Sequence, residues 1–287
     1  MPEMPEVESL ARFLSEKCVG HAIARVDLAA FSALKTYQPP LSALAGLEIE
    51  SVTRHGKFLD ISAQGLHLVF HLARAGWLRW RAAIPDTPTR PGKGPLALRL
   101  RLDDSSGFDL TEAGTQRKLA VYVVADPQEI PHVATLGPDP LADEFDQELL
   151  AALLRGAGRS QLKGVLKDQR TIAGIGNAYS DEILHAARLS PFKPANALTE
   201  GELSTLYEAI KRELSEAISR AEGLAAADLK SEKKSGLRVH GRKGEACGVC
   251  GATIAEVSFA DSALQYCPTC QTGGKLLADR RLSKLLK

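Results

Sequence analysis

The chain has 287 residues, of which 44% are hydrophobic and 25% charged, and its formal net charge is +1. This ordinary globular composition excludes a disordered or collagen-like chain, and no stretch reaches the roughly 18 uninterrupted apolar residues that a membrane-spanning helix needs. The acidic N-terminus lacks the basic start and apolar run of a secretory signal, which predicts a soluble intracellular protein without a membrane partner.

The first predicted element is a helix that begins at Pro5. Proline suits the first helical position, and Glu6 and Glu8 complement the positive end of the helix dipole. Apolar residues recur at the spacing of one helical face, at Val7, Leu10, Ala11 and Leu14.

Seven short runs of apolar or alternating residues follow, separated by Gly, Pro, Asp and Ser. Their spacing is typical of a β-sandwich or barrel. The runs cover residues 24–28, 49–53, 58–62, 66–72, 96–102, 108–111 and 119–124. The next segment, 126–140, holds four prolines and few periodic apolar residues, which predicts a linker.

Beyond this segment the apolar spacing becomes helical. One helix is indicated by the apolar residues from Phe145 to Leu153, and a longer one by those from Leu203 to Ala221. Thr199 is of a residue type that caps helices, and we expect it to cap the longer one.

The C-terminal segment is basic, since residues 229–287 hold 11 Lys or Arg against 5 Asp or Glu. A basic segment on a nearly neutral chain indicates an anionic partner, most commonly nucleic acid. A surface that is merely soluble would explain the same charge.

Four of the five cysteines form two CxxC pairs, Cys247 with Cys250 and Cys267 with Cys270, with sixteen residues between the pairs. This spacing matches a zinc ribbon with four thiolate ligands, whose intervening residues return the chain as a hairpin. Two disulfides are the alternative, which the lack of an export signal disfavours. Four protein ligands leave no position for water, so we expect one structural zinc ion. Cys18 is expected to be a small buried hydrophobe.

A glycine turn lies between two helical patterns, where Gly174 and Gly176 flank Ile175 and a helix is predicted after Asn177. Such a turn presents backbone N–H groups beside a helix N-terminus, which suits a phosphodiester. The side-chain amide of Asn177 adds a donor. Taken alone, most such turns are only tight connections.

The first residues, Met1-Pro2-Glu3, carry groups suited to covalent chemistry. Removal of Met1 leaves Pro2 with a secondary amine, and because the α-amino group has a reference pKa of about 7.7–8, part of it is neutral near pH 7. Such an amine can attack a sugar C1′, displace the base and form an iminium that promotes β-elimination. Glu3 would exchange protons with the sugar or the leaving group. A disordered start without a role is the simpler interpretation of three residues alone.

Five segments occur together in one order: residues 1–8, 54–59, 71–72, 168–182 and 247–270. In this combination the chain closely resembles the formamidopyrimidine-DNA glycosylase/endonuclease VIII (Fpg/Nei) family of DNA repair enzymes over nearly its whole length. The resemblance implies an α+β fold, with an N-terminal helix plus β-sandwich and a helical helix–two-turn–helix domain that carries a four-cysteine zinc hairpin. We expect a catalytic domain at 1–125, a linker at 126–143, the helix–two-turn–helix domain at 144–236 and the zinc hairpin at 237–287.

The resemblance assigns catalytic roles by position. Pro2 would be the Schiff-base nucleophile, Glu3 the acid/base and Glu6 a supporting carboxylate. Lys57 would bind backbone phosphate near the lesion and transfer a proton in β-elimination. Without the resemblance, Lys57 would be interpreted as a solvated surface lysine after a β-turn.

The resemblance also implies DNA contacts. His71, Asn177 and the turn with Gly174 and Gly176 would bind phosphate, and these are the donor types that hold phosphate in general. Taken by itself, His71 would be interpreted as a core histidine that closes an apolar strand.

Several positions depart from the family pattern. Arg74 replaces the methionine that fills the space of the extruded base, and it could still insert into the stack. In an alignment over residues 115–120, Lys118 and Leu119 stand where the family inserts Arg and Phe. The stretch from Gly223 to Leu237 is several residues shorter than the loop with which Fpg enzymes cap 8-oxoguanine.

The zinc hairpin departs as well, because Ser262 occupies the position of the family's phosphate-binding arginine, within residues 259–266. That arginine is linked to δ-elimination, so its replacement puts the second strand-cleaving step in question. Gln265 and Lys275 are the candidates to substitute for it.

These features together predict a bifunctional DNA glycosylase/AP lyase of base excision repair. The altered residues favour oxidised pyrimidines or abasic sites over 8-oxoguanine. The expected partner is damaged double-stranded DNA, and the expected protein is monomeric, cytoplasmic and associated with a bacterial nucleoid. Two alternatives stay open: a non-catalytic protein that binds lesions or abasic sites, and a zinc-ribbon adaptor for protein or RNA.

Overall fold

The computed structural model describes residues 1–92, 94–114, 116–259 and 262–278. They form two compact units, one of residues 1–136 with 221–232 and one of residues 137–220 with those from Lys233 onward. Among the described residues, no helix is both long enough and apolar enough to cross a membrane.

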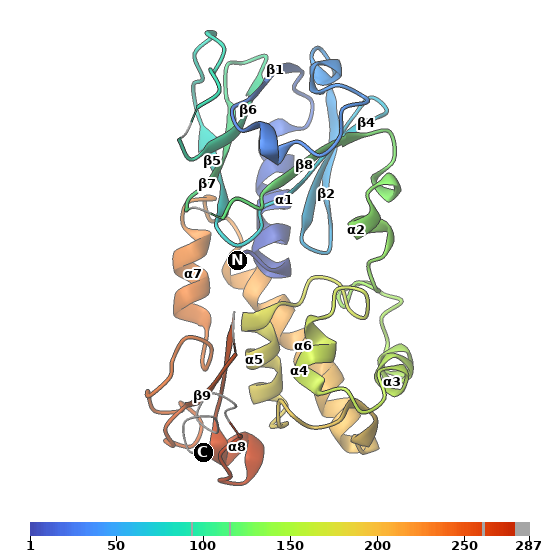
Figure 1. The fold of residues 1–287 in the computed structure, drawn as a ribbon, viewed down its shortest axis with the longest axis vertical. Coiled ribbons are helices and arrows are strands. Elements are labelled where there is room, and N and C mark those ends of the chain that lie inside the picture. The colour runs from blue at the N-terminus through green and yellow to red at the C-terminus, as the bar shows by residue number, and fades with distance from the viewer. Residues whose placement is uncertain (93, 115, 260–261, 279–287) are drawn as a thin grey trace. The chain divides into compact units, whose positions relative to one another are not determined.

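The first unit is a β-sandwich with one long helix, drawn in blue to green in Figure 1. One sheet has the strand order β1-β6-β7-β5 and the other β2-β3-β4-β8, and all neighbours are antiparallel. The elements are α1 (Met4–Cys18), β1 (Ile23–Leu28), β2 (Ile49–His55), β3 (Phe58–Ala63), β4 (Leu66–His71), β5 (Gly76–Arg81), β6 (Leu96–Leu102), β7 (Gly107–Glu112) and β8 (Ala120–Val124). Short helices η1 (Phe31–Ala33), η2 (Leu41–Leu44), η3 (Pro127–Glu129) and α2 (Pro131–Ala134) complete it.

The core of this unit lies between the inner faces of the two sheets and α1. Alternate residues of the strands, such as Ile61, Phe70 and Leu100, are fully buried there because successive side chains of a strand point to opposite faces. The predicted apolar face of α1 is buried in the same core, at Val7, Leu10, Ala11 and Leu14. All seven predicted strands are present, and β5 is an additional one.

The second unit is mainly helical and carries the small hairpin of the C-terminal cysteines, drawn in yellow to red in Figure 1. Its elements are α3 (Gln147–Gly156), α4 (Leu162–Lys167), α5 (Asn177–Ala186), η4 (Ala195–Ala197), α6 (Glu200–Arg220), the end of α7 (Leu229–Gly236), β9 (Ala255–Ser258), β10 (Ala263–Tyr266) and α8 (Pro268–Thr272).

The long helix α6 begins at the predicted cap. The Glu202 backbone N–H donates to Thr199 Oγ1 at 3.3 Å, and the Thr199 backbone N–H donates to Glu202 Oε2 at 2.9 Å. This reciprocal pair is a capping box, which satisfies backbone donors that the first turn of a helix leaves open.

The predicted fold class is confirmed: a β-sandwich with an N-terminal helix, a helical part, and a four-cysteine cluster near the C-terminus. The bounds of the four segments expected from the sequence stay predictions. The expected linker contains η3 and α2, and Ile130 between these helices and Val133 of α2 are buried against the outer face of the β2-β3-β4-β8 sheet.

Candidate functional site

The start of α1 is fixed by a capping box between Glu3 and Glu6. The Glu3 backbone N–H donates to Glu6 Oε2 at 2.7 Å, and the Glu6 backbone N–H donates to the Glu3 side chain. Pro2 is buried beside them, and both carboxylates are almost inaccessible, at 2% and 4% exposure. Because each carboxylate is held at a defined position, the beginning of the chain is ordered, which removes the basis for interpreting it as a disordered start.

An ion pair joins this helix start to the neighbouring sheet. Arg54 Nε of β2 lies 2.8 Å from Glu8 Oε2, and the Arg54 side chain is only 8% exposed. The Lys57 turn begins two residues after Arg54 along the chain. The pair therefore ties the turn of α1 that follows Pro2 to the strand that leads into the Lys57 turn. Sequence reasoning did not identify it, because nothing local to Glu8 indicates a partner 46 residues away.

Lys57 lies in the two-residue turn between β2 and β3, where His55 and Phe58 are paired. Gly56 takes a φ of +55°, which a tight hairpin turn of this length requires and which glycine adopts at little cost. Lys57 is only 7% exposed, so it is a buried lysine and not a solvated surface one.

Two histidines brace the base of this hairpin through one buried carboxylate. Asp60 of β3 accepts from His55 Nε2 of β2 and from His67 Nδ1 of β4, each at 2.9 Å. Asp60 is 3% exposed. Its lone pairs are thus satisfied across three adjacent strands, which restricts movement of the turn that carries Lys57.

His71 ends β4 directly beside this turn. Its ring lies 4.8 Å from the Phe58 ring, and its Nδ1 accepts the Ala73 backbone N–H at 3.2 Å. Burial and the nearby charge of Lys57 lower the pKa of His71 to about 4, with a smaller effect from His132. The ring is therefore neutral at pH 7, and because Nδ1 is an acceptor, Nε2 carries the proton and is the available donor.

The turn after His71 presents Arg74. The Gly76 N–H donates to the Leu72 carbonyl at 2.9 Å, and Ala73 has a φ of +52°. A Cβ at position 76 would lie 2.1 Å from the Leu72 oxygen, so only glycine closes this turn. Arg74 is exposed at its tip.

The loop before β8 is organised by Glu112, which is 4% exposed. Its carboxylate accepts the backbone N–H groups of Lys118 at 2.8 Å and Leu119 at 3.0 Å. The Lys118 side chain is exposed, whereas Leu119 is buried in the sandwich core. The expectation that Leu119 stands in an inserting position therefore differs from the structure, because an apolar residue beside the core gains more from burial. Thr115 lies outside the described residues.

In the helical unit, the glycine turn is braced from within. Gln169 Oε1 accepts the Gly174 N–H at 3.0 Å, and Gln169 Nε2 donates to the Ile175 carbonyl at 2.7 Å. Gly174 has a φ of +87°, and Gly176 is the N-cap of α5. The Gly174 N–H, which the sequence indicated as a phosphate donor, is thus already used inside the turn.

Asn177, the first residue of α5, is directed toward the zinc hairpin. Its Nδ2 donates to the Ala263 carbonyl of β10 at 2.8 Å. Its Oδ1 is buried and has no hydrogen-bond partner among the residues that the structure describes. One Nδ2 hydrogen remains for a further acceptor, since an amide nitrogen carries two.

A buried ion pair that sequence reasoning missed lies beneath Asn177. Lys163 Nζ donates to Asp181 Oδ1 at 2.6 Å, to Ser180 Oγ at 2.8 Å and to the Asn177 carbonyl at 2.9 Å. Lys163 is 6% exposed and Asp181 is fully buried. A buried lysine needs such compensation, because burying an uncompensated charge costs several kcal/mol, on the order of 3–5 when one partner is lost.

Helix α5 also holds the segment that leads into the cysteines. Asp181 Oδ2 accepts from His240 Nδ1 at 2.7 Å. Glu182 accepts the backbone N–H groups of three consecutive residues, Arg238, Val239 and His240, at 2.8 to 3.0 Å. The zinc hairpin is therefore attached to α5 by two carboxylates, which accept hydrogen bonds from the His240 ring and from three backbone N–H groups.

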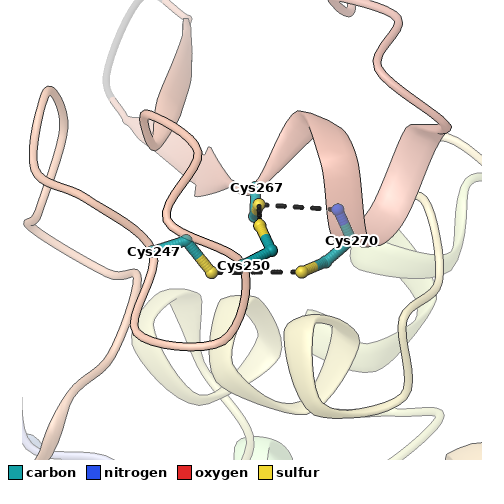
Figure 2. Close-up of side chains that lie close together, drawn as sticks. All are labelled: Cys247, Cys250, Cys267 and Cys270. Carbon is teal, nitrogen blue, oxygen red and sulfur yellow. Dashed lines mark hydrogen bonds between the residues drawn. The ribbon is translucent and has the colours of Figure 1, made fainter.

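The four predicted cysteine ligands come together (Figure 2). Cys247 Sγ lies 4.0 Å from Cys270 Sγ, and Cys250 Sγ lies 3.4 Å from Cys267 Sγ. All four sulfur atoms lie within 4.8 Å of one another. A tetrahedral zinc ion with Zn–S bonds of about 2.3 Å requires sulfur atoms about 3.8 Å apart, so the cluster fits one zinc ion.

The pKa values of the cysteine thiols also favour a bound zinc ion. Desolvation raises the pKa values of Cys267 and Cys270. Backbone and thiol hydrogen bonds, first among them the Ala252 N–H, lower the pKa of Cys250 to about 7. Four thiols this close cannot all ionise in the absence of a cation, because the thiolates would repel one another, whereas a divalent ion offsets this repulsion. The structure shows free cysteines and no disulfide at this cluster.

Three residues of the zinc hairpin and the segment after it concern the phosphate-binding arginine of the family, whose position Ser262 occupies. Ser262 is partly exposed, while residues 260 and 261 lie outside the described residues. Gln265 is 5% exposed, and its side chain bonds to Glu256 and to the Gly241 N–H, so it is not available as a substitute. Lys275 is exposed.

Comparisons with known proteins match this architecture segment by segment. The N-terminal domain of formamidopyrimidine-DNA glycosylase matches residues 1–120, its H2TH domain matches 136–228, and the zinc finger found in FPG and IleRS matches 244–273. A formamidopyrimidine-DNA glycosylase of Symbiobacterium thermophilum is 36% identical over 98% of this chain and 93% of its own length. This chain belongs to the formamidopyrimidine-DNA glycosylase family.

Other members are similar over different spans. An uncharacterised formamidopyrimidine-DNA glycosylase-like protein of Mycobacterium tuberculosis is 57% identical over 55% of this chain and 98% of its own length. The structure of Lactococcus lactis Fpg with DNA that contains an abasic site superimposes with a TM-score of 0.82, at 27% identity, over 94% of this chain and 99% of that one. MutM in complex with DNA that contains carbocyclic 8-oxo-G gives 0.82 at 28% identity, over 94% of this chain and all of the other.

As a member of the family, this chain is a DNA-binding DNA glycosylase of DNA repair. The zinc-finger match and the four-cysteine cluster together assign one structural zinc ion, held by Cys247, Cys250, Cys267 and Cys270. The ion supplies folding energy to a hairpin whose own apolar cluster is small.

Proposed function

We propose that the protein is a bifunctional glycosylase and AP lyase that forms a Schiff base between damaged DNA and its N-terminal proline. The observation that carries this proposal is the buried start of α1, where the capping box with Glu6 fixes Glu3, the residue that follows Pro2. A nucleophile held in this way has little freedom to lose when the substrate binds.

The chemistry follows from the side chains around Pro2. Once Met1 is removed, the neutral secondary amine attacks C1′ of the damaged nucleotide, the C1′–N bond breaks, and the base leaves with a proton supplied by an acid. Glu3 is our candidate for that acid and for the base that later accepts a proton. The amine then loses its proton, the C1′–O4′ bond breaks with a proton delivered to O4′, and an iminium forms between C1′ and Pro2. This iminium withdraws electrons, a C2′ proton is removed, and the C3′–O bond breaks, which nicks the strand.

Phosphate binding is assigned to the cations and donors beside the Lys57 turn. Lys57 supplies a charge, and neutral His71 supplies an Nε2–H donor whose direction is set by the Ala73 contact. Lys118 is exposed on a loop anchored by Glu112. Asn177 and the turn of Gly174 and Gly176 stay candidates, with Asn177 limited to its second amide hydrogen and with the Gly174 N–H already bonded to Gln169 Oε1.

For the lesion, we propose oxidised pyrimidines and abasic sites in preference to 8-oxoguanine. Two features support this preference. Arg74 is exposed at the tip of a closed turn, from which we propose that it occupies the space of an extruded base. The short segment after Gly223 is folded against the sandwich, since Trp77 Nε1 donates to the Ala226 carbonyl at 3.0 Å and Lys230 Nζ lies 4.4 Å from the Trp77 ring centroid.

Borohydride trapping on an oligonucleotide with one abasic site tests the mechanism. The parent protein should give a covalent adduct, whose peptide carries the modification at Pro2, and Pro2→Gly should give little or none. Arg12→Ala on the exposed side of α1 is the matched control and should be trapped like the parent. An adduct on a lysine, or none at all in a protein that still binds the duplex, would refute the Schiff base at Pro2.

A protein that binds the duplex but gives no adduct would instead be a non-catalytic protein that binds lesions. Ser262 in place of an arginine favours that alternative. An incision panel with 8-oxoguanine, thymine glycol, dihydrouracil and abasic duplexes tests the lesion preference separately. Faster incision of the 8-oxoguanine duplex than of the thymine glycol duplex would contradict it.

A further inference from the structure

We propose that His185 donates a hydrogen bond from Nε2 to the zinc-bound sulfur of Cys247, and that this bond slows release of the metal. His185 lies on α5, outside the cysteine hairpin, and its Nε2 is 3.3 Å from Cys247 Sγ. Both residues are buried, at 4% and 2% exposure. This inference is independent of the proposed chemistry at Pro2.

The need for such a donor follows from charge. Four thiolates on one divalent ion leave a net charge of −2, and Cys247 is, with Cys267, one of the two ligands that are buried. A buried charge without a donor is costly, and hydrogen bonds to charged acceptors are stronger than those between neutral groups. A nitrogen donor to the sulfur withdraws part of its charge and makes the sulfur a poorer target for protons and electrophiles.

The contacts of α5 separate this role from simple attachment of the hairpin. Asp181 and Glu182 already hold the hairpin segment, through His240 and through three backbone N–H groups. His185 follows Asp181 by four residues, so both lie on the same face of α5. Of these residues, His185 is the one whose bond ends on a metal ligand.

The test compares His185→Phe, which keeps a ring of similar size but removes the donor, with His185→Gln, which keeps an N–H donor. Zinc release from the full-length protein is followed with a colorimetric chelator in excess. We expect release from His185→Phe to be about tenfold faster than from the parent, the scale typical for loss of a hydrogen bond to a ligand. We expect His185→Gln to recover most of the difference.

A second measurement responds to the bond and not to packing. In protein loaded with Co²⁺ in place of zinc, the sulfur-to-metal charge-transfer band should move to lower energy in His185→Phe, because the sulfur electrons are no longer stabilised by the donor. His240→Phe is the matched control: it removes an attachment contact that does not reach sulfur, and its band should stay at the parental energy.

A third measurement needs no variant. In zinc-loaded parent protein labelled with ¹⁵N-histidine, long-range proton–nitrogen correlation should show the His185 ring protonated at Nε2. A ring with a bare Nε2 would overturn the proposal, as would parental zinc release together with an unshifted cobalt band in a folded His185→Phe. Faster release without a band shift and without recovery in His185→Gln would also overturn it, because packing alone would then explain the effect.

Discussion

Replacing Glu8 by Gln tests whether the ion pair between α1 and β2 holds the start of the chain in place. Glu8 Oε2 is 2.8 Å from Arg54 Nε, and Glu8 Oε1 is 2.9 Å from Arg12 Nε. Gln keeps the size and one acceptor oxygen, but it removes the negative charge beside a guanidinium that is 8% exposed.

The magnitude follows from the burial of each partner. Removing one member of a fully buried pair costs about 3–5 kcal/mol. The Glu8 side chain is 22% exposed and Gln retains a hydrogen bond, so we expect a loss of about 2 kcal/mol in the free energy of unfolding. The pair with Arg12, whose side chain is 54% exposed, should contribute at most ~0.5 kcal/mol.

Thermal unfolding at pH 7 measures both effects. Glu8→Gln should lower the Tm by roughly 4–8 °C, given about 2–4 °C per kcal/mol for a unit of this size, while Arg12→Ala should change it little. Because displacing α1 also displaces Pro2, the rate of borohydride trapping should fall by an order of magnitude, roughly. Equal Tm values for the two variants, within the experimental error, would show that the Glu8 to Arg54 pair does not secure α1.

Three further outcomes are expected. Removal of zinc by a chelator should make residues 237–278 sensitive to protease and weaken binding to duplex DNA. Re-addition of zinc should restore protease resistance and DNA binding. A metal-free protein with unchanged protease resistance would argue against a structural ion. The pKa of His71 is lowered to about 4 from 6.5, so the unfolded state binds a proton at this ring before the folded state does as the pH falls. The free energy of unfolding should therefore fall by about 2 kcal/mol between pH 7.5 and 5. Urea unfolding of His71→Gln should lack this part of the pH dependence. Gly76→Ala should destabilise by at least about 2 kcal/mol in urea unfolding, whereas Gly201→Ala, with open space around it inside α6, should be neutral or stabilising.

The parts that the sequence predicted correctly depend on local spacing. The apolar face of α1 and the seven strands follow from periodicities of 3.6 and 2 residues, which any window of ten residues displays. The cap at Thr199 and the four-cysteine cluster follow from residue types at fixed offsets. The strand β5 escaped prediction because Arg79, Trp80 and Arg81 break the apolar run, although their backbones pair with β7.

The features that the sequence could not predict depend on long-range contacts. Glu112 fixes a loop whose Leu119 then turns into the core, and only the three-dimensional position of Glu112 reveals this. Gln169 occupies the Gly174 N–H, although the glycine pattern alone indicates a free donor. In both cases a polar side chain satisfies backbone N–H groups, and at Gly174 that group is one the glycine pattern had indicated as a phosphate donor.

Helix α5 shows why such contacts concentrate near the cysteines. From Ser180 to His185 every residue of this helix is buried, although four of the six are polar or charged. Buried polar groups are stable only when each has a partner, and here the partners are Lys163, His240, the backbone of residues 238–240 and a zinc ligand. The helix thus positions the zinc hairpin by directed bonds, which fix one geometry, whereas a small apolar cluster would permit several. Loss of either the metal or these partners should therefore affect the same hairpin.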